Sequence, residues 1–567
     1  MNLDFRYAGR SGLTGGAQDA RLALATNQLR EATYFRGTLG QPLLVREGLA
    51  ALYDVVVSDF KWRPLARVEY RAWLERQDQA FVAGLGARSL HAKQRMAVLH
   101  ARLTELDAAR TLRRMPFDAA RTRWMHYAVH DQVELNRVLD PVITVHPDQL
   151  SFEAFSRDQS SYARLGLSHG VFARIDEIEY GTTNIDFSAS LHDHLDRLRS
   201  YRSTRFDVGA GGFSSERLQP QASDHCALEK RIELPHGWLE GFLRVHGLMS
   251  MGLTRLRLAP IDVLNVLNFL LAHKTRQSPR ALRFELRPGE AVRLVLEPWN
   301  RSFWCSPSSI YQGEQIQTIR VWGRERLRVL QRVLPQAKHI DVYLAASGLP
   351  SVWVVALPGD VEFTLALSGW TDNDWVEGEA RFDLLTRRLT VSATELDLVY
   401  NTLRGQRWAR TPELAAGLGL GIEKTRSALS ILCEAGRAMV DLSSDCVRHR
   451  DLLMSPFVAS QALSLVKQTQ ASDPKAKAGQ AVFDTGAIHI IARRPVADGY
   501  KLSGNAADGA TRVRPLLHVN AAGEILDASC TCAQMQRDGL AKGPCPHVLA
   551  LRLAHMQRLQ QEDGGGQ

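Results

Sequence analysis

Three of the seven cysteines in this 567-residue chain lie close together near its end, and a histidine completes the group. Cys530 and Cys532 are separated by one residue, and Cys545 and His547 form a second such pair after twelve intervening residues. Each pair can supply two ligands from one tight turn, and the loop lets the second pair complete a tetrahedron around Zn²⁺. Thiolates and an imidazole suit zinc rather than magnesium or calcium, which take oxygen ligands. Four protein ligands fill the coordination sphere, so the pattern predicts a structural zinc site.

The segments around these residues are expected to position them. Val513–Val519 and Glu524–Ala528 have the alternation of a hairpin that ends at the first ligand pair. Gly543-Pro544 sharpens the second turn. His547 then opens a predicted amphipathic helix over Val548–Leu559. The face of this helix expected to be apolar carries Leu549, Leu553 and Met556.

A Cys-x-Cys pair, a loop, a Cys-x-His pair and an apolar helix make the module at residues 485–560 similar to the SWIM-type zinc finger. The match covers all four ligands and the ββα arrangement around them, about a tenth of the chain. The resemblance implies zinc as the cofactor and an interaction with nucleic acid or with another protein. Such a finger would recognise its partner through surface residues. The candidates are Arg537 and Lys542 in the loop and Arg552, His555 and Arg558 on the helix.

The whole chain more weakly resembles bacterial SWIM zinc-finger proteins, in which a long N-terminal region precedes the finger. Phe152–Arg157 and Thr183–Ser188 belong to that region here. Proteins of this kind are typically encoded beside MoxR-type AAA+ ATPases and von Willebrand A proteins. The resemblance therefore implies a multi-protein bacterial system in which the ATPase is a separate chain. A net charge of +9 favours anionic partners but does not decide between nucleic acid and protein.

A second candidate for recognition is a winged-helix-like segment at residues 390–455. Ser392 and Glu395 form a capping-box pattern that opens a helix. Thr411-Pro412 opens a short second helix, and Ile422–Ala435 is predicted to be a third. A predicted hairpin follows, so the order of elements resembles a winged helix-turn-helix domain.

If this segment binds DNA, Lys424 and Arg426 lie at the front of the recognition helix, with Arg448 and Arg450 on the wing. Two glutamates share that helix, however, and many winged helices pack against proteins instead. Two interpretations therefore stay open. The chain is a DNA-binding transcriptional regulator that uses this segment together with the finger, or the segment has a protein-packing role.

The length and the pattern of the remaining residues predict an α+β multidomain protein, because a single core rarely exceeds about 300 residues. The predicted parts are a mostly helical region at 1–145, a mixed region at 146–225, an α+β domain at 226–385, the winged-helix-like segment at 390–455, a linker at 467–480 and the finger module at 485–560. The helices expected in the first part are Gln18–Arg36, Leu90–Leu112 and Phe117–Leu139. The strands expected in the α+β domain are Leu282–Leu286, Ala291–Leu296, Thr318–Trp322, Ile340–Leu344, Val352–Ala356 and Val361–Leu367, with helices at Ile261–His273 and Glu325–Leu334.

The sequence predicts a cytoplasmic protein without a membrane partner. Met1–Gly16 has no apolar core of a secretory signal, and the longest apolar runs are too short to span a bilayer. An enzyme with a site in the N-terminal region, around His126 and Asp158, is a further hypothesis. No nucleophile–base pair or open metal site supports it, so we expect no catalytic residues. The other four cysteines, Cys226, Cys305, Cys433 and Cys446, are scattered and are expected to be buried thiols.

Overall fold

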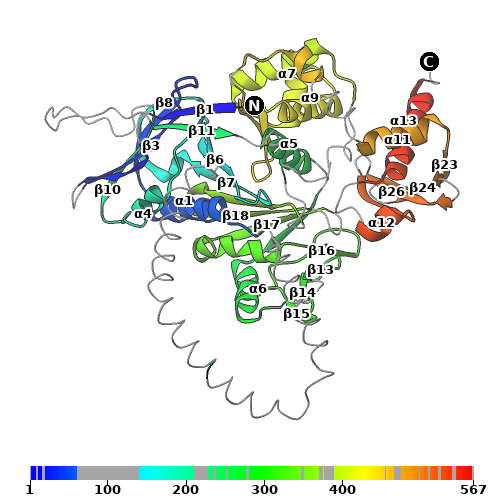
Figure 1. Ribbon diagram of the computed structural model, residues 1–567, viewed down its shortest axis with the longest axis horizontal. Helices are drawn as coiled ribbons and strands as arrows, with labels where there is room; N and C mark the ends of the chain where they lie inside the picture. The colour runs from blue at the N-terminus through cyan, green and yellow to red at the C-terminus, as the bar shows by residue number, and fades with distance from the viewer. Residues whose placement is uncertain are drawn as a thin grey trace. The chain divides into compact units, whose positions relative to one another are not determined.

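The computed structural model describes residues 2–7, 10–15, 19–60, 102, 140–209, 228–233, 238–250, 253–275, 280–345, 350–369, 375, 389–453, 455–464, 474–496, 499–508, 511–520, 525–538 and 544–564. The chain divides into one unit made of Met1–Phe60 with Leu139–Gln567 and a second unit, Lys61–Val138. The fold described below is that of the first unit, which mixes helices and sheets (Figure 1). The predicted helices Leu90–Leu112 and Phe117–Leu139, with His126, lie outside the described residues except for Arg102.

The first part of the chain forms strands where the sequence predicted a helix. A five-stranded sheet has the order β2-β3-β10-β4-β8. Its strands are β2 (Gly12–Thr14), β3 (Asp19–Ala25), β10 (Ser203–Gly209), β4 (Tyr34–Leu39) and β8 (Phe172–Glu179). The prediction of a helix at Gln18–Arg36 is therefore wrong. The buried run from Leu22 to Ala25 is short, and periodicity alone cannot assign a short apolar run to helix or strand.

The described part of residues 1–145 is accordingly not mostly helical. Its one helix is α1 (Pro42–Val57). A further two-stranded pairing joins β1 (Asn2–Tyr7) with β11 (Leu228–Glu233). The short helices η2 (His169–Val171) and α4 (Ala189–Leu195) complete the N-terminal elements.

An eight-stranded antiparallel sheet forms the centre, in the order β12-β17-β18-β19-β7-β6-β5-β9. Its strands are β12 (Thr254–Leu258), β17 (His339–Leu344), β18 (Ser351–Ala356), β19 (Glu362–Leu367), β7 (Ser161–Ser168), β6 (Gln149–Phe155), β5 (Val142–Val145) and β9 (Gly181–Asn184). Because β19 pairs with β7, the predicted regions 146–225 and 226–385 share this sheet. The predicted boundary at residue 225 does not separate two sheets.

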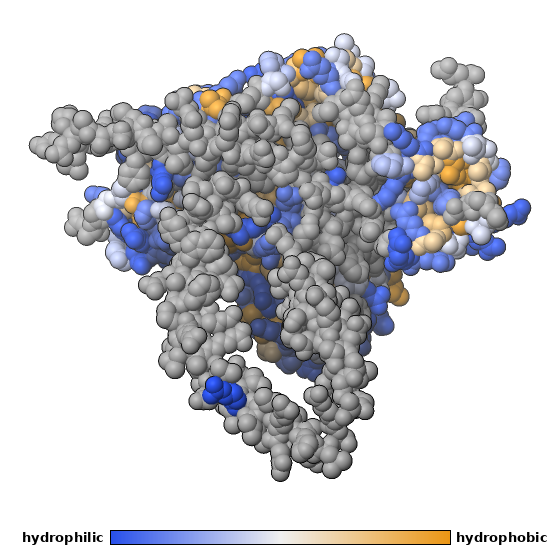
Figure 2. Space-filling model, in the orientation of Figure 1, coloured by the Kyte–Doolittle hydropathy of each residue, from blue (hydrophilic) through white to orange (hydrophobic). Residues whose placement is uncertain are grey.

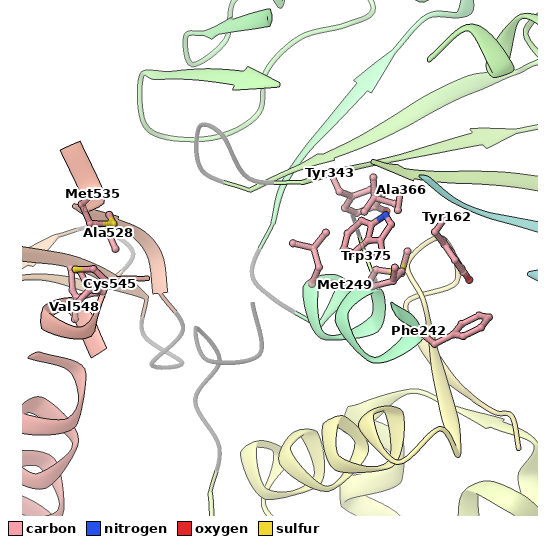
Figure 3. Packing of buried hydrophobic residues seen from close by; sticks show 14 of the residues in the cluster. Tyr162, Phe242, Met249, Tyr343, Ala366, Trp375, Ala528, Met535, Cys545 and Val548 are labelled. Atoms are coloured by element: carbon pink, nitrogen blue, oxygen red, sulfur yellow. The ribbon is translucent and has the colours of Figure 1, made fainter. Parts of the chain in front are cut away.

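Both faces of this sheet are covered, which explains why β6 and β7 are buried almost without alternation. On one face, Gly48 of α1 lies against Leu165. On the other face, Phe155 and Tyr162 contact Phe242 of α5 (Trp238–Met249). Figure 3 shows Phe242 and Tyr162 in this packing.

A four-stranded sheet, β15-β14-β13-β16, contains three of the six strands predicted for the α+β domain, and the other three are β17, β18 and β19 of the central sheet. Its strands are β13 (Leu282–Leu286), β14 (Arg293–Leu296), β15 (Arg301–Trp304) and β16 (Gln317–Val321). The predicted first helix is α6 (Pro260–Ala272). The second is a 3₁₀-helix, η3 (Arg324–Arg332), followed by η4 (Leu334–Gln336), and η5 (Pro358–Asp360) connects β18 to β19.

The winged-helix-like segment has the predicted order of elements. They are α7 (Ala393–Gln406), β20 (Trp408–Ala409), α8 (Thr411–Leu418), α9 (Ile422–Glu434), β21 (Ala438–Asp441) and β22 (Cys446–His449), with a sheet of order β20-β22-β21. The capping box of Ser392 and Glu395 is confirmed. Gly436 follows α9 with a φ of 70°, a left-handed conformation that glycine adopts without strain. Local start and stop signals were sufficient to place these helices.

The C-terminal module, residues 474–564, is larger than a ββα finger. Its elements are α11 (Pro474–Asp484), β23 (Ile488–Val496), β24 (Gly499–Asp508), β25 (Thr511–Val513), β26 (Pro515–Asn520), β27 (Ile525–Cys530), α12 (Ala533–Asp538) and α13 (Pro546–Gly564). The predicted hairpin and helix are β26, β27 and α13. Residues 474–480 of the predicted linker belong instead to α11, where alanine and lysine are strong helix formers.

Close packing of α13 against the sheet leads to a test of the module's core. A Cβ added at Gly504 of β24 would lie 2.7 Å from Leu551 Cδ1. We expect Gly504→Val to lower the free energy of unfolding of the module by about 1–3 kcal/mol, because overpacking forces backbone shifts. Ser503→Val, on the opposite face of the same strand, should change it by less than about 0.5 kcal/mol. Thermal unfolding checks this, and an equal effect of the two substitutions would contradict the packing.

Candidate metal centre

The four predicted ligands converge at one end of the C-terminal module. Cys530 is the last residue of β27, Cys532 immediately precedes α12, and Cys545 immediately precedes α13. Their ligand atoms and that of His547 all lie within 4.8 Å of one another, and all four residues are buried. Figure 3 shows Cys545 beside Val548, with Ala528 and Met535 nearby. The cluster could therefore hold a metal ion inside an apolar shell.

Two helix starts orient the sulfur atoms. The backbone carbonyl of Cys532 accepts the N–H of Gln536, and that of Cys545 accepts the N–H of Leu549. The thiols of the same two cysteines accept the backbone N–H groups of Met535 and Val548, and these hydrogen bonds partly offset the rise in the pKa of both thiols. Positive charge at a helix N-terminus favours the thiolate form, which is the form that binds metal.

Hydrogen bonds among the ligands shift their pKa values in opposite directions. Cys545 and His547 hydrogen-bond to Cys530, and the pKa of Cys530 is lowered to about 4. The pKa of Cys545 is raised because it donates to Cys530 and is buried, and burial raises the pKa of Cys532. One thiolate is thus stabilised by its neighbours, whereas three thiolates in this space require a cation. A divalent metal that displaces the protons meets this requirement.

The spacing of the donor atoms fits zinc. Sγ of Cys545 and Nδ1 of His547 are 4.0 Å apart. Bond lengths of about 2.3 Å to sulfur and 2.1 Å to nitrogen in a tetrahedron would place these atoms about 3.6 Å apart, so closure needs a shift of a few tenths of an ångström. The turn that carries the first pair is fixed by Thr531, whose Oγ1 accepts the N–H of Arg514 at 2.9 Å. The donor set is consistent with zinc, which would be held by the three thiolates and the imidazole.

The helix that follows the ligands buries a different face from the predicted one. Val548 and Leu551 are fully buried and Leu549 nearly so, but Leu553 and Met556 are half-buried. His555, predicted as a surface residue, is 4% exposed, and its Nε2 lies 2.8 Å from the hydroxyl of Tyr500. That prediction is wrong because α13 packs both on the sheet and on α11, and His555 faces the sheet.

The other candidate contact residues of the module are distributed over α12 and α13. Arg537 on α12 and Arg558 on α13 are exposed, and Arg552 on α13 is half-buried. Lys542 lies outside the described residues. The structure thus places these arginines on two different helices, and their role in binding stays a prediction.

In the winged-helix-like segment, the candidate contact residues have acidic partners. Lys424 forms a 2.7 Å ion pair with Glu395 of α7, and Arg426 forms one of 2.7 Å with Glu423 one turn before it. Their positive charges are therefore partly neutralised at the surface. The helix itself, α9, packs against α5.

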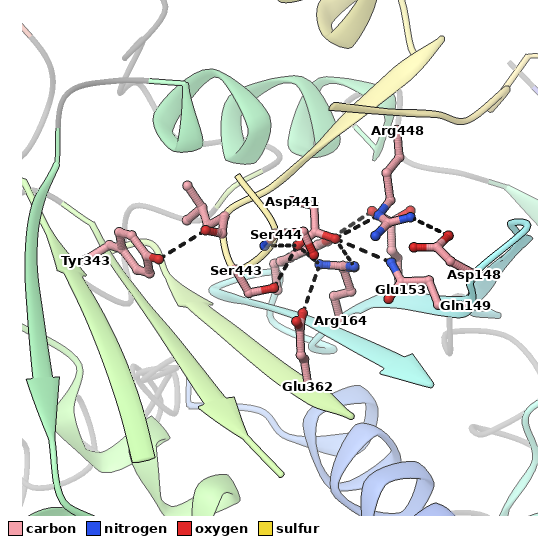
Figure 4. A network of polar contacts seen from close by, with 12 residues as sticks. Asp148, Gln149, Glu153, Arg164, Tyr343, Glu362, Asp441, Ser443, Ser444 and Arg448 are labelled. Atoms are coloured by element: carbon pink, nitrogen blue, oxygen red, sulfur yellow. Dashed lines mark hydrogen bonds and ion pairs between the residues drawn. The ribbon is translucent and has the colours of Figure 1, made fainter. Parts of the chain in front are cut away.

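The wing is attached to the central sheet by a buried ionic network (Figure 4). Asp441 of β21 accepts hydrogen bonds from Arg164 of β7 at 3.0 and 2.8 Å and from Arg448 of β22 at 2.7 Å. Arg448 also donates to Asp148 at 2.8 Å. Burial raises the pKa of Asp441, but the two arginines lower it by more, so the net pKa lies well below its usual range. Two guanidinium groups thus hold this carboxylate in its ionised form.

A second buried group lies beside the first. Glu153 of β6 accepts hydrogen bonds from Arg450 and from the hydroxyl of Tyr162, both at 2.7 Å. Nδ1 of His246 on α5 accepts the N–H of Val440 in the wing at 3.2 Å. Arg448 is 2% exposed and Arg450 is fully buried, so the prediction that these arginines are available on the wing is wrong. Their partners are separated from them by about 300 residues in sequence, and no local pattern indicates them.

The buried histidines in this contact predict a dependence of stability on pH. Burial lowers the pKa of His246 and of His449 to about 4, below the value of about 6.5 expected in the unfolded chain. The unfolded state then binds more protons, so stability should fall as the pH decreases from about 6.5 to 4. Protonation of Asp441 and Glu153, whose pKa values are lowered, should reduce it further below about pH 4. Urea midpoints across this range test the prediction, and a constant midpoint from pH 7 to 4 would contradict it.

Asp158, the other residue considered for a catalytic role, closes a turn. Its carboxylate accepts hydrogen bonds from the hydroxyls of Ser156 and Ser160, at 2.6 and 2.9 Å, and from the N–H of Phe60 at 2.7 Å. These contacts connect the end of β6 to the start of β7. The three described cysteines outside the cluster, Cys305, Cys433 and Cys446, are buried as predicted, and Cys226 lies outside the described residues.

Comparisons with known proteins do not assign this chain to a family. No protein-family model matches it, and neither does any curated protein. Among solved structures, a chain of "C-terminal region of FEN-1 bound to A. fulgidus PCNA" aligns at 10% identity over 41% of this chain and 90% of that chain, with a TM-score of 0.29. None of the described helices combines the length and hydropathy needed to cross a membrane. The chain is a mixed α+β protein with a three-cysteine, one-histidine cluster that could hold a metal ion.

Proposed function

We propose that this chain is a zinc-binding, non-enzymatic interaction protein whose C-terminal module is a SWIM-type zinc finger. The observation that supports this is the convergence of Cys530, Cys532, Cys545 and His547 within 4.8 Å in a buried pocket. Four protein donors complete a tetrahedron and leave no position for a reacting water molecule. The metal therefore has a structural role, and its binding free energy is part of the folding free energy of the module.

The folded module binds nucleic acid or a protein partner within a multi-protein bacterial system. A MoxR-type AAA+ ATPase and a von Willebrand A protein are the separate chains of that system, as the resemblance to bacterial SWIM proteins implies. A reducing compartment such as the cytoplasm keeps three neighbouring cysteines available as thiolates instead of disulfides.

The alternative, a DNA-binding transcriptional regulator that also uses the winged-helix-like segment, receives less support. Arg448 and Arg450 are buried in the contact with the central sheet, and Lys424 and Arg426 have acidic partners. These contacts favour a packing role for that segment. We therefore assign recognition to the C-terminal module alone.

Purification of the full chain from its native host tests the proposal. About one zinc ion per chain is expected by elemental mass spectrometry, because one cluster of four ligands binds one metal. A co-purifying ATPase, von Willebrand A protein or nucleic acid would identify the partner. A folded preparation without stoichiometric metal would disprove the assignment of the finger, and turnover of a substrate would disprove the non-enzymatic role.

A further inference from the structure

The sheet of the C-terminal module has one covered face and one open face. On the covered face, Leu502 and Leu517 are buried and Gly504 lies under Leu551 of α13. Side chains alternate along each strand, so the residues between these point to the other side. We call this other side the outer face; it carries Arg494, Lys501, Arg512, His518 and Asp527. Figure 2 shows hydrophilic residues along the rim of the module.

Four of these residues form a row across the sheet. Arg494 of β23 lies opposite Lys501 of β24, Lys501 lies opposite His518 of β26, and His518 lies opposite Asp527 of β27. Adjacent strands are about 4.8 Å apart, so the row spans about 15 Å. Arg512 of β25 lies opposite Ala507 of β24 and adds a further cation to the same face.

The charges on this face are unbalanced. Arg494, Lys501 and Arg512 are exposed, and Asp527 is the acid of the row. The side chains of Arg494 and Arg512 form no hydrogen bond or ion pair with any described residue. Partial burial of the Asp527 carboxyl raises its pKa, and the positive charges of His518 and Lys501 act to lower it. This influence agrees with the position of all three side chains on the outer face. The outer face is thus complementary to an anionic partner.

The composition of the face indicates which polyanion fits. Ser503 of β24 and Ser529 of β27 lie on the same face, one on each side of Leu516 of β26, and their hydroxyls can donate to phosphate oxygens. Among the described residues, the outer face carries no Phe, Tyr or Trp, and Tyr500 belongs to the covered face, where it contacts His555. Proteins that bind single strands stack bases on aromatic side chains. A face without them suits the external phosphates of a duplex.

We propose that the outer face binds the phosphate backbone of duplex DNA without reading its sequence. The inference rests on the proposed function, because it requires the zinc-bound module to be folded. It places the contacts on the sheet instead of on the loop and helix residues Arg537, Lys542, Arg552 and Arg558.

The test uses the full zinc-loaded chain and a short fluorescent DNA duplex, with affinity measured as a function of salt. Three engaged cations predict a slope of about −3 for log affinity against log salt, or a roughly 40-fold loss of affinity between about 50 and 200 mM. Replacing both Arg494 and Lys501 by Gln should reduce the slope to about −1, with a loss of only about fourfold over the same range.

A matched control removes the same number of charges from the helical side of the module. Lys477 on α11 and Arg558 on α13 are both exposed, and replacing both by Gln should leave the slope at about −3. A reduced slope for this helical variant with an unchanged slope for the sheet variant would overturn the proposal. Tighter binding of a single strand than of the duplex would also overturn it.

The zinc content of every preparation separates this inference from the proposed function. A chain that binds about one zinc ion but no duplex would overturn the inference and leave the zinc finger intact. A chain that binds duplex through Arg494 and Lys501 but holds no zinc would overturn the proposed zinc finger instead. The variant with Arg494 and Lys501 replaced by Gln should retain its zinc and its unfolding temperature, so that its lower salt slope reflects lost phosphate contacts.

Discussion

The Cys545→Ser variant should lose its zinc and much of the structure of the C-terminal module, while the rest of the chain stays folded. Cys545 is fully buried, its thiol neighbours Cys530, and its backbone carbonyl begins α13. Loss of one ligand removes much of a metal-binding free energy that is about 10–16 kcal/mol in zinc-finger peptides. Because α13 covers the sheet, its release should expose the core of the module.

Elemental analysis and hydrogen exchange would measure this effect. Zinc content should fall from about one per chain towards zero, and amides of β24, β26 and α13 should lose protection. Cys305→Ser provides the matched control, because Cys305 is also a buried thiol but lies outside the cluster. Equal zinc content in the two variants would show that Cys545 is not a ligand.

Removal of the carboxylate at Asp441 is expected to have the second large effect. Asp441→Ala leaves Arg164 and Arg448 buried without this counterion, although Asp148 still contacts Arg448. Breaking a buried ion pair by removing one partner costs about 3–5 kcal/mol, because the remaining charge has lost both water and its partner. Urea unfolding followed by tryptophan fluorescence should show this loss in the unit that contains the central sheet.

Glu423→Ala is the matched control for this substitution. Glu423 also forms a 2.7 Å ion pair, with Arg426, but both side chains are about two-fifths exposed. Exposed pairs contribute about 0–1 kcal/mol because water already solvates both groups. Similar destabilisation by the two substitutions would show that burial does not set the strength of the network at the wing.

The sequence was informative where the determinants of structure are local. The spacing of Cys530, Cys532, Cys545 and His547 predicted the metal cluster, and the capping pattern at Ser392 predicted the start of α7. Both depend on residues close together in the chain. Alternation of apolar residues likewise predicted β13, β14 and β16 to within two residues.

Long-range pairing could not be predicted in this way. Arg164 and Asp441 are 277 residues apart, and in sequence each resembles an ordinary surface charge. His555 has the polarity of an exposed helical residue, and its burial depends on Tyr500 of β24, a strand about 50 residues earlier in the chain. The cations of the outer face were missed for the same reason, because Arg494 and Lys501 meet only through strand pairing. The alternating pattern of β23 and β24 was the signal that could have revealed them.

Two glycines flanking α13 offer a means of recognising related chains. A Cβ at Gly479 of α11 would lie 2.8 Å from Cβ of Leu549, and one at Gly504 would lie 2.7 Å from Leu551. At Gly479 the helix itself would have to move to make room for a Cβ, whereas at Gly504 the nearest atom is the end of the flexible Leu551 side chain. The loop between the two ligand pairs can vary in length among related chains. The close approach of α11 to α13 at Gly479 cannot vary in the same way. Distant homologues should thus keep a glycine in the preceding helix, even where the remaining sequence has diverged beyond detection, whereas the glycine of β24 can be replaced where residue 551 is smaller.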